Sequence, residues 1–247
     1  MNIDILFFAL LLVISFLYSS VGHGGASGYL ALMALFNFTS ATMRPTALLL
    51  NVLVSGIAFV QFYRNGFFRW ELFWPFAATS LPAAFIGGLI DLDEVTYGKM
   101  LGILLLISVI RLVVTDHKQD KVKSHINIAG ALIAGAVIGL ISGTIGIGGG
   151  IILSPLILFL KWANIKEAAA VSALFIFVNS IAGLAGVFLK GSQFDGMMAG
   201  MMAGMMAVSF AGGMLGAFAG ASKFNSTVLK YSLSIVLIIA SAKLLFT

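Results

Sequence analysis

The sequence contains no cysteine and very few charged residues. The absence of cysteine excludes disulfide bonds, thiolate metal sites and cysteine nucleophiles together. Charged residues make up only 9% of the 247 residues, whereas an average soluble protein has about a quarter. Hydrophobic residues reach 60%, an excess that a water-soluble core cannot bury but a lipid bilayer can accommodate. The composition therefore predicts a membrane protein.

Carboxylates are also scarce, and none of the nine lies centrally in an expected membrane span. This argues against a transporter of metal cations, which need charged oxygen ligands. The sequence has no HExxH motif, nucleophile elbow or P-loop. We therefore expect no enzyme activity, no metal site and no cofactor. The net charge of +5 comes from Lys and Arg in short loops, which does not indicate nucleic-acid binding.

A glycine-rich turn occurs twice in the chain. The first copy is Val-Gly-His-Gly-Gly-Ala at 21–26, and the second is Ile-Gly-Ile-Gly-Gly-Gly at 145–150, 124 positions later. The same shift also aligns Leu50 with Leu174, among other apolar positions. The chain is therefore a tandem duplication. Apolar segments interrupted by glycine at matching places in two halves are the best sequence indication of a transporter's binding site.

Apolar segments separated by polar turns predict a chain that is all-α. We expect helices at 3–21, 25–37, 43–63, 70–90, 96–115, 126–145, 149–160, 167–189, 196–220 and 227–246. The polar segment 116–124 separates a first repeat, 1–115, from a second, 125–247. A full span needs about 20 apolar residues, so 25–37 and 149–160 are too short. Each is expected to be a half-helix that returns to the side from which the preceding helix entered.

Lysine and arginine set the expected orientation, because they are enriched in cytoplasmic loops. Four basic groups fall on one side if each glycine turn sends the chain back: Arg64 with Arg69; Arg111 with Lys118, Lys121 and Lys123; Lys161 with Lys166; and Lys223 with Lys230. Loop 91–94 and both termini then lie on the opposite, non-cytoplasmic side of the cytoplasmic (inner) membrane. Lys190 and Lys243 go against this pattern.

This orientation makes each half cross the membrane an odd number of times. The expected fold is a polytopic membrane helix bundle of two inverted repeats, with short half-helices after glycine-rich turns. In such an arrangement the two turns approach each other from opposite faces of the membrane.

The turns predict a binding site for a small anion. Their glycines allow positive φ angles and close approach of a ligand. The first N–H groups of each following half-helix are free and carry a partial positive charge, which binds anions without a side-chain cation. The alternative is that the glycines only permit tight helix crossing. The candidate substrate-binding residues are Gly22, His23, Gly24, Gly25, Ser27, Asn51, Ser55, Gly146, Gly148, Gly149, Gly150, Ser172 and Asn179.

His23 lies in the middle of the first turn, where the second turn has Ile147. Its pKa near neutrality would let it donate to an anion or gain a proton as the anion binds. The alternative is a neutral histidine whose hydrogen bond goes to a backbone carbonyl.

Polar residues follow one face of two equivalent helices. Asn51 and Ser55 are four residues apart, and Ser172 and Asn179 lie on a stripe of the equivalent helix in the second half. We expect these side chains to line one central cavity. Interhelical hydrogen bonds that hold the bundle together are the alternative.

A methionine-rich run, Gly196–Val208, repeats glycine every four residues, and Gly212, Gly216 and Gly220 extend the repeat. Thioethers can bind copper, but no histidine or cysteine completes such a site. A small residue at every fourth position is typical of close helix packing, which we expect here and at Ala131, Gly135, Gly139 and Gly143.

The segment Gly-Leu-Ile-Ser-Gly-Thr-Ile-Gly-Ile-Gly-Gly-Gly-Ile-Ile-Leu-Ser-Pro-Leu-Ile at 139–157 resembles the TauE/SafE family of membrane permeases, also called sulfite exporter-like. The resemblance continues through 167–173 and recurs more weakly over 19–88, where His23 and Ala-Ser-Gly at 26–28 replace the fuller glycine run. It implies a duplicated bundle in the cytoplasmic membrane that carries small anions, such as sulfite, sulfoacetate or related organosulfonates.

The expected function is transport of a small anion, sulfite or a sulfur-containing organic anion, by alternating access. The alternatives are a non-transporting membrane scaffold or assembly subunit, and an anion channel. The expected partners are the anion and the lipid bilayer, with no nucleic acid, and the sequence is compatible with a homo-oligomer.

The expected topology is open to a direct test, because the chain is naturally free of cysteine. Single cysteines introduced by Asp93→Cys and Ser124→Cys should react with a membrane-impermeant thiol reagent from opposite sides of sealed vesicles. Labelling of both from the same side would show that the topology is wrong.

Overall fold

The computed structural model describes residues 5–20, 25–114, 126–191, 196–220 and 226–246, all as helices and the loops between them. The helices are α1 (Ile5–Ser20), α2 (Ala26–Leu35), α3 (Ser40–Arg64), α4 (Trp70–Leu89), α5 (Glu94–Val114), α6 (Ile128–Ile145), α7 (Gly150–Phe159), α8 (Ile165–Leu189), α9 (Gly196–Gly220) and α10 (Ser226–Phe246). The all-α fold is confirmed, and so are the expected helix positions. The largest difference is at the start of α3, at Ser40 instead of 43.

Four of the described helices are long and apolar enough to cross a membrane, namely α3, α4, α6 and α8. Helices α2 and α7 are apolar but have only 10 residues each. Their length confirms the expectation of half-helices, since a full span needs about twice as many residues.

The two half-helices begin in the same backbone conformation. The N-cap residue of α2 is Gly25 with φ 82°, and that of α7 is Gly149 with φ 75°. Both are left-handed, a region that residues with a Cβ rarely adopt. Glycine is therefore required at the same position of each half.

The half-helices also end alike. After α2, Asn37 has φ 60°, and after α7, Lys161 has φ 59°; these are the two non-glycine residues with positive φ in the described chain. In both cases the next residue, an aromatic, donates its N–H back to a carbonyl five residues earlier, at 3.0 Å. This pattern is a Schellman motif. The duplication seen in the sequence thus extends to backbone geometry at both ends of the half-helix.

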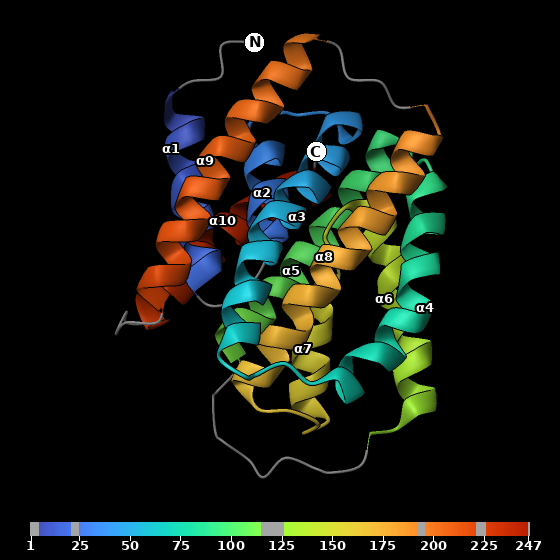
Figure 1. Ribbon diagram of the computed structural model, residues 1–247. Coiled ribbons are helices and arrows are strands. Elements are labelled where there is room, and N and C mark those ends of the chain that lie inside the picture. Colours follow the sequence, from blue (N-terminus) through green and yellow to red (C-terminus); the bar gives the residue numbers. More distant parts are fainter. Residues whose placement is uncertain (1–4, 21–24, 115–125, 192–195, 221–225, 247) are drawn as a thin grey trace.

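The helices of the two halves exchange partners (Figure 1). Helix α4, from the first half, packs against α6 and α8 of the second half, and α9, from the second half, packs against α1 and α3 of the first. Helices α3 and α8 also pack against each other, as do α5 and α10. The packed units therefore differ from the two halves of the sequence.

Glycines allow α4 and α6 to pack backbone against backbone. A Cβ added at Gly135, Gly139 or Gly143 of α6 would collide with the carbonyl groups of Phe76, Ser80 or Ala84 of α4. The close-packing role expected for these glycines is confirmed.

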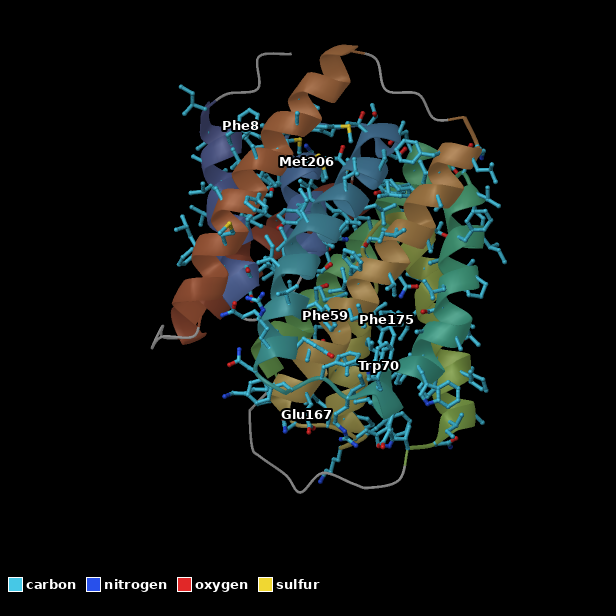
Figure 2. All side chains as sticks on the ribbon, viewed as in Figure 1. Phe8, Phe59, Trp70, Glu167, Phe175 and Met206 are labelled. Carbon is cyan, nitrogen blue, oxygen red and sulfur yellow. The ribbon has the colours of Figure 1, made fainter. Side chains whose placement is uncertain are left out.

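In α9, Gly212 and Gly216 pack in the same way on backbone carbonyls of α1. Within the methionine run, Gly204 contacts only the ring of Phe8, and Gly200 has nothing within 4 Å. Figure 2 shows Phe8 and Met206 where α1 and α9 approach each other. The close-packing interpretation thus holds for the second part of α9 and not for Gly200.

The two lysines that go against the charge pattern both have local partners. Lys190 forms an ion pair with Asp91. The Nζ of Lys243 donates to the carbonyl oxygens of Ala34 (2.8 Å) and Leu35 (3.1 Å), at the C-terminal end of α2, and to Oδ1 of Asn37 (2.7 Å). Cations are favoured at helix C-termini, so Lys243 is explained by its contact with α2.

The close packing of α4 and α6 predicts a difference between two glycine-to-alanine substitutions. Gly139→Ala should lower stability by about 1–3 kcal/mol, because the methyl group would overlap the Ser80 backbone. Gly200→Ala is the matched control in an open position and should leave stability unchanged or raise it slightly. Thermal unfolding in detergent measures both. Equal midpoints would contradict the packing described for α6.

Candidate functional site

The second glycine turn connects α6 to α7 inside the bundle. Gly146 ends α6 with φ 88°, and Gly148 and Gly149 follow with φ 76° and 75°. All three are buried. A side chain at any of them would be strained by the left-handed conformation, so the sequence of this turn follows from its shape.

The turn leaves peptide N–H groups available at the start of α7. The first hydrogen bonds of the helix run from the N–H groups of Ile152 and Leu153 to the carbonyl of Gly149. Among the described residues, none accepts a hydrogen bond from the N–H of Gly148, Gly149 or Gly150. These groups and the helix dipole place a partial positive charge inside the bundle.

Two polar side chains from different helices flank Gly148. A Cβ built there would lie 2.9 Å from Nδ2 of Asn51 on α3 and 3.4 Å from Oγ of Ser180 on α8. Both side chains are fully buried, and neither Oδ1 of Asn51 nor Oγ of Ser180 has a hydrogen-bond partner. Buried polar atoms without a partner are rare, and a ligand is one of the few explanations for them.

The structure brings some of the candidate residues to this turn. Asn51 donates from Nδ2 to the Gly146 carbonyl at 3.4 Å. One turn along α3, Ser55 donates to the carbonyl of Asn51. Asn179 lies on the α8 face that meets the turn, because its neighbours Phe175 and Ser180 contact Gly149 and Gly148. Figure 2 shows Phe175 in the interior of the bundle.

Ser172 and Ser27 have other partners. The Ser172 hydroxyl is 2.7 Å from that of Ser154 on α7, and the Ser27 hydroxyl is 2.7 Å from that of Tyr18 on α1. Both are buried in these pairs. They therefore tie each half-helix to a neighbour.

The first turn is described only at its end. Gly22, His23 and Gly24 lie outside the described residues. Gly25 is covered by the ring of Tyr29, whose hydroxyl is 2.7 Å from the position of an added Cβ. At the equivalent place in the second half the residue is Leu153. The two turns thus have similar backbones but different side chains around them.

The inspection of the sequence missed Ser180 and Arg44. Ser180 is eight residues after Ser172 and so lies on the same helix face, a spacing that would have identified it. Arg44 is the fifth residue of α3 and lies at the start of the helix expected at 43–63, and its side chain is buried.

The guanidinium group of Arg44 joins the ends of two other helices. Its Nε donates to the Gly143 carbonyl (2.9 Å), and its two terminal nitrogens donate to Ile90 (2.7 Å) and Gly87 (2.6 Å). These carbonyls belong to the C-terminal ends of α6 and α4, where a cation is favoured. Its Cγ is 3.4 Å from the Cβ position of Gly146, and its charged end is bonded to the carbonyl of Gly143, three residues before that glycine.

Comparison with known proteins identifies the family. The model of the family described as "Sulfite exporter TauE/SafE" matches residues 6–244. The chain belongs to the TauE/SafE family. The resemblance expected from the glycine motif is therefore confirmed over almost the whole length.

Two relatives are described as probable membrane transporters. The probable membrane transporter protein y4hK of Sinorhizobium fredii is 41% identical over 178 residues, which cover 70% of this chain and 72% of that protein. The probable membrane transporter protein MJ0441 of Methanocaldococcus jannaschii is 29% identical over 108 residues, 41% of this chain and 38% of that protein. No solved structure matches. Together with the long apolar helices, the family makes this chain a multi-pass membrane protein of a transporter family.

The contacts of Arg44 predict a large effect of its removal on stability. Arg44→Met should destabilise the protein strongly, because three carbonyls lose their donor and each buried unsatisfied group costs about 1–3 kcal/mol. Arg44→Lys should lie in between, since an ammonium group lacks the planar fork. Arg64→Met, at the exposed end of the same helix, is the control. An unfolding midpoint of Arg44→Met equal to that of the control would contradict this role.

Proposed function

We propose that the protein carries a small anion across the membrane by alternating access, with sulfite or a sulfur-containing organic anion as the substrate. The observation that carries the proposal is the pair of unpartnered, fully buried polar groups, on Asn51 and Ser180, beside Gly148 at the start of α7. The family description, which names sulfite export, supports the choice of substrate.

The charge around the second turn favours an anion. The N–H groups at the start of α7 and the hydroxyl of Ser180 can donate to it, and such helix starts bind anions readily. The Arg44 guanidinium, bonded to the Gly143 carbonyl, adds a positive charge at the end of α6 that leads into the turn. The only carboxylate in α3, α6, α7 and α8 is Glu167, and Figure 2 shows it at the lower end of the bundle. These four helices therefore bring no carboxylate to the turn that would repel an anion.

The arrangement of the helices supports two inverted halves. In Figure 1, α3 runs downward and α4 upward, and α6 rises from the lower end before α7 returns to it. The exchange of α4 and α9 between the halves gives each half an equivalent set of partners, as a two-fold relation requires. Two such halves can rock against each other around a fixed site, which is how many transporters with inverted repeats work.

The charges at the two ends of the bundle support the proposed orientation. The loops at the lower end carry Arg64, Arg69, Lys161 and Lys166. The loop between α4 and α5, at the other end, carries Asp91, Asp93 and Glu94, and Lys190 nearby is paired with Asp91. By the positive-inside rule the lower end is cytoplasmic. The protein would then lie in the inner membrane with both termini on the non-cytoplasmic side.

Flux measurements test the function. The purified protein in sealed lipid vesicles should take up labelled sulfite, thiosulfate or an organosulfonate such as sulfoacetate or taurine, with saturation as the concentration rises. Vesicles without protein are the control, and sulfate tests selectivity. Absence of flux and binding for all these anions would favour a scaffold or assembly subunit. Flux that does not saturate would favour a channel.

A pair of substitutions tests the position of the site. Gly148→Ala should reduce flux at least tenfold, because its methyl group would lie 2.8 Å from Cγ2 of Ile176 and 2.9 Å from Nδ2 of Asn51, against the proposed site. Gly66→Ala is the matched control: Gly66 has φ 74° against 76° for Gly148, but nothing lies within 4 Å of its Cβ position. Both alanines carry a similar strain of about 1–2 kcal/mol. If both variants transport equally well, the site is not at the second turn.

A further inference from the structure

Two buried amide groups, Asn51 beside the second turn and Asn179 on the facing helix α8, have the same arrangement. Asn51 and Asn179 are both fully buried. Each uses its Nδ2 to donate to a backbone carbonyl, that of Gly146 at 3.4 Å for Asn51 and that of Phe175 at 2.8 Å for Asn179. Exchanging nitrogen and oxygen would place two acceptors against each other, so these bonds set the orientation of both amides. In both cases Oδ1 is left without a donor.

An anion alone does not satisfy these oxygens. Amide oxygens only accept hydrogen bonds, and a fully ionised oxyanion also only accepts. The N–H groups of Gly148, Gly149 and Gly150 need an acceptor, whereas Oδ1 of Asn51 and of Asn179 need a donor. A ligand that fits the site has to provide both, because a buried acceptor without a donor is unfavourable.

A metal cation bound together with the anion is disfavoured by the surrounding charges. The Arg44 guanidinium already places a positive charge at the end of α6, and its three bonded partners are neutral carbonyls. Helices α3, α6, α7 and α8 bring no carboxylate to the turn that could balance a second cation there.

We infer that the substrate binds as a singly protonated oxyanion, whose O–H donates to Oδ1 of Asn51 or Asn179 while its charged oxygens accept from the start of α7. This inference rests on the proposed function and narrows its substrate class. It selects hydrogen anions of weak oxyacids, such as hydrogensulfite, over sulfonates, whose oxygens carry no hydrogen at neutral pH.

The groups around the site leave the substrate as the main source of pH dependence. The charged or titratable residues that contact the turn or the adjacent first half-helix are Arg44 on α3, Tyr97 on α5, whose hydroxyl donates to the Ile145 carbonyl at 2.9 Å, Tyr29 on α2, Tyr18 on α1, which is bonded to Ser27, and Lys243 on α10, which is bonded to the opposite, C-terminal end of α2. Helices α6, α7 and α9 carry no titratable side chain. The titratable side chains of α4 and α8 lie in the first turn of each helix, apart from the glycine turn. Arginine, lysine and tyrosine do not change charge near neutral pH. His23, outside the described residues, does, so the measurement is made in a His23→Gln background.

The experiment compares two anions of the same charge and similar shape. Binding of sulfite and of methanesulfonate to the purified His23→Gln protein is measured by calorimetry between about pH 5.5 and 8.5. Methanesulfonate has three oxygens and a methyl group on its sulfur but no hydroxyl, so it can only accept hydrogen bonds, and it stays singly charged throughout. The apparent Kd for sulfite should rise about tenfold per pH unit above the pKa of hydrogensulfite, because only the protonated fraction binds. Methanesulfonate should bind at least tenfold more weakly than hydrogensulfite, without pH dependence.

Substitutions of the two asparagines test whether their amides cause the preference for hydrogensulfite over methanesulfonate. Asn51→Leu should bring the affinities for hydrogensulfite and methanesulfonate close together by weakening the first. Asn179→Leu should weaken hydrogensulfite binding in the same way but less. The Asn179 amide donates only within its own helix, so this variant should fold even if Asn51→Leu does not, and it then provides the test. Ser209→Ala, a buried serine on α9 whose hydroxyl also lacks a partner, is the control and should leave the ratio unchanged.

The outcomes separate this inference from the proposed function. Sulfite binding that does not change with pH, as expected if a trapped water satisfies the amide oxygens, would overturn the inference and leave anion binding intact. Binding that instead requires sodium at every pH would overturn it in favour of a bound cation. If neither anion nor any other tested oxyanion binds at any pH, to the His23→Gln protein or to the unsubstituted protein, the proposed function itself is wrong.

Discussion

Inside a lipid bilayer a peptide group has no water to bond to, so every break in a helix has to be satisfied by the protein or by a ligand. This constraint applies most strongly at the break between α6 and α7. The carbonyl side of the break is satisfied by three donors from other helices: Arg44 bonds to Gly143, Tyr97 to Ile145 and Asn51 to Gly146. The N–H groups of Gly148, Gly149 and Gly150 have no such partner among the described residues. The carbonyls of the break are thus bonded within the protein, and these three N–H groups are the ones that we propose bind the anion.

The duplication preserves backbone shape and changes chemistry. Gly25 and Gly149 keep the same left-handed conformation, as do Asn37 and Lys161. The side chains around the two turns differ, because Arg44 and Tyr29 of the first half correspond to Ala168 and Leu153 of the second. Where only glycine fits, the two copies remain alike. Where a side chain can be accommodated, the two copies have diverged.

Close contact between helix backbones holds the exchanged helices in place. Helix α4 lies so near to α6 that a methyl group at Gly139 would overlap the Ser80 carbonyl, and α9 meets α1 in the same way at Gly216. Hydrophobic burial gives little advantage to helix association in lipid, since the lipid tails are equally apolar. Close packing at small residues is therefore the main source of specificity. It joins the two halves through contacts that cross between them.

The sequence by itself determined the helices, the two half-helices and the glycine turns of this protein. These depend on local properties: the length of apolar segments, the positive φ that only glycine adopts easily, and the repetition of both after 124 residues. The candidate residue Asn51 followed from the same reasoning, because a polar residue in an apolar span needs a partner. Only the tertiary structure decided that Ser27 pairs with Tyr18, that Ser172 pairs with Ser154, and that Ser180 joins Asn51 at the turn. It also decided that α4 packs on α6 and α9 on α1. Helices with similar apolar surfaces are distinguished by how closely their backbones fit, and this fit depends on two helices together, so the sequence of one segment does not reveal it.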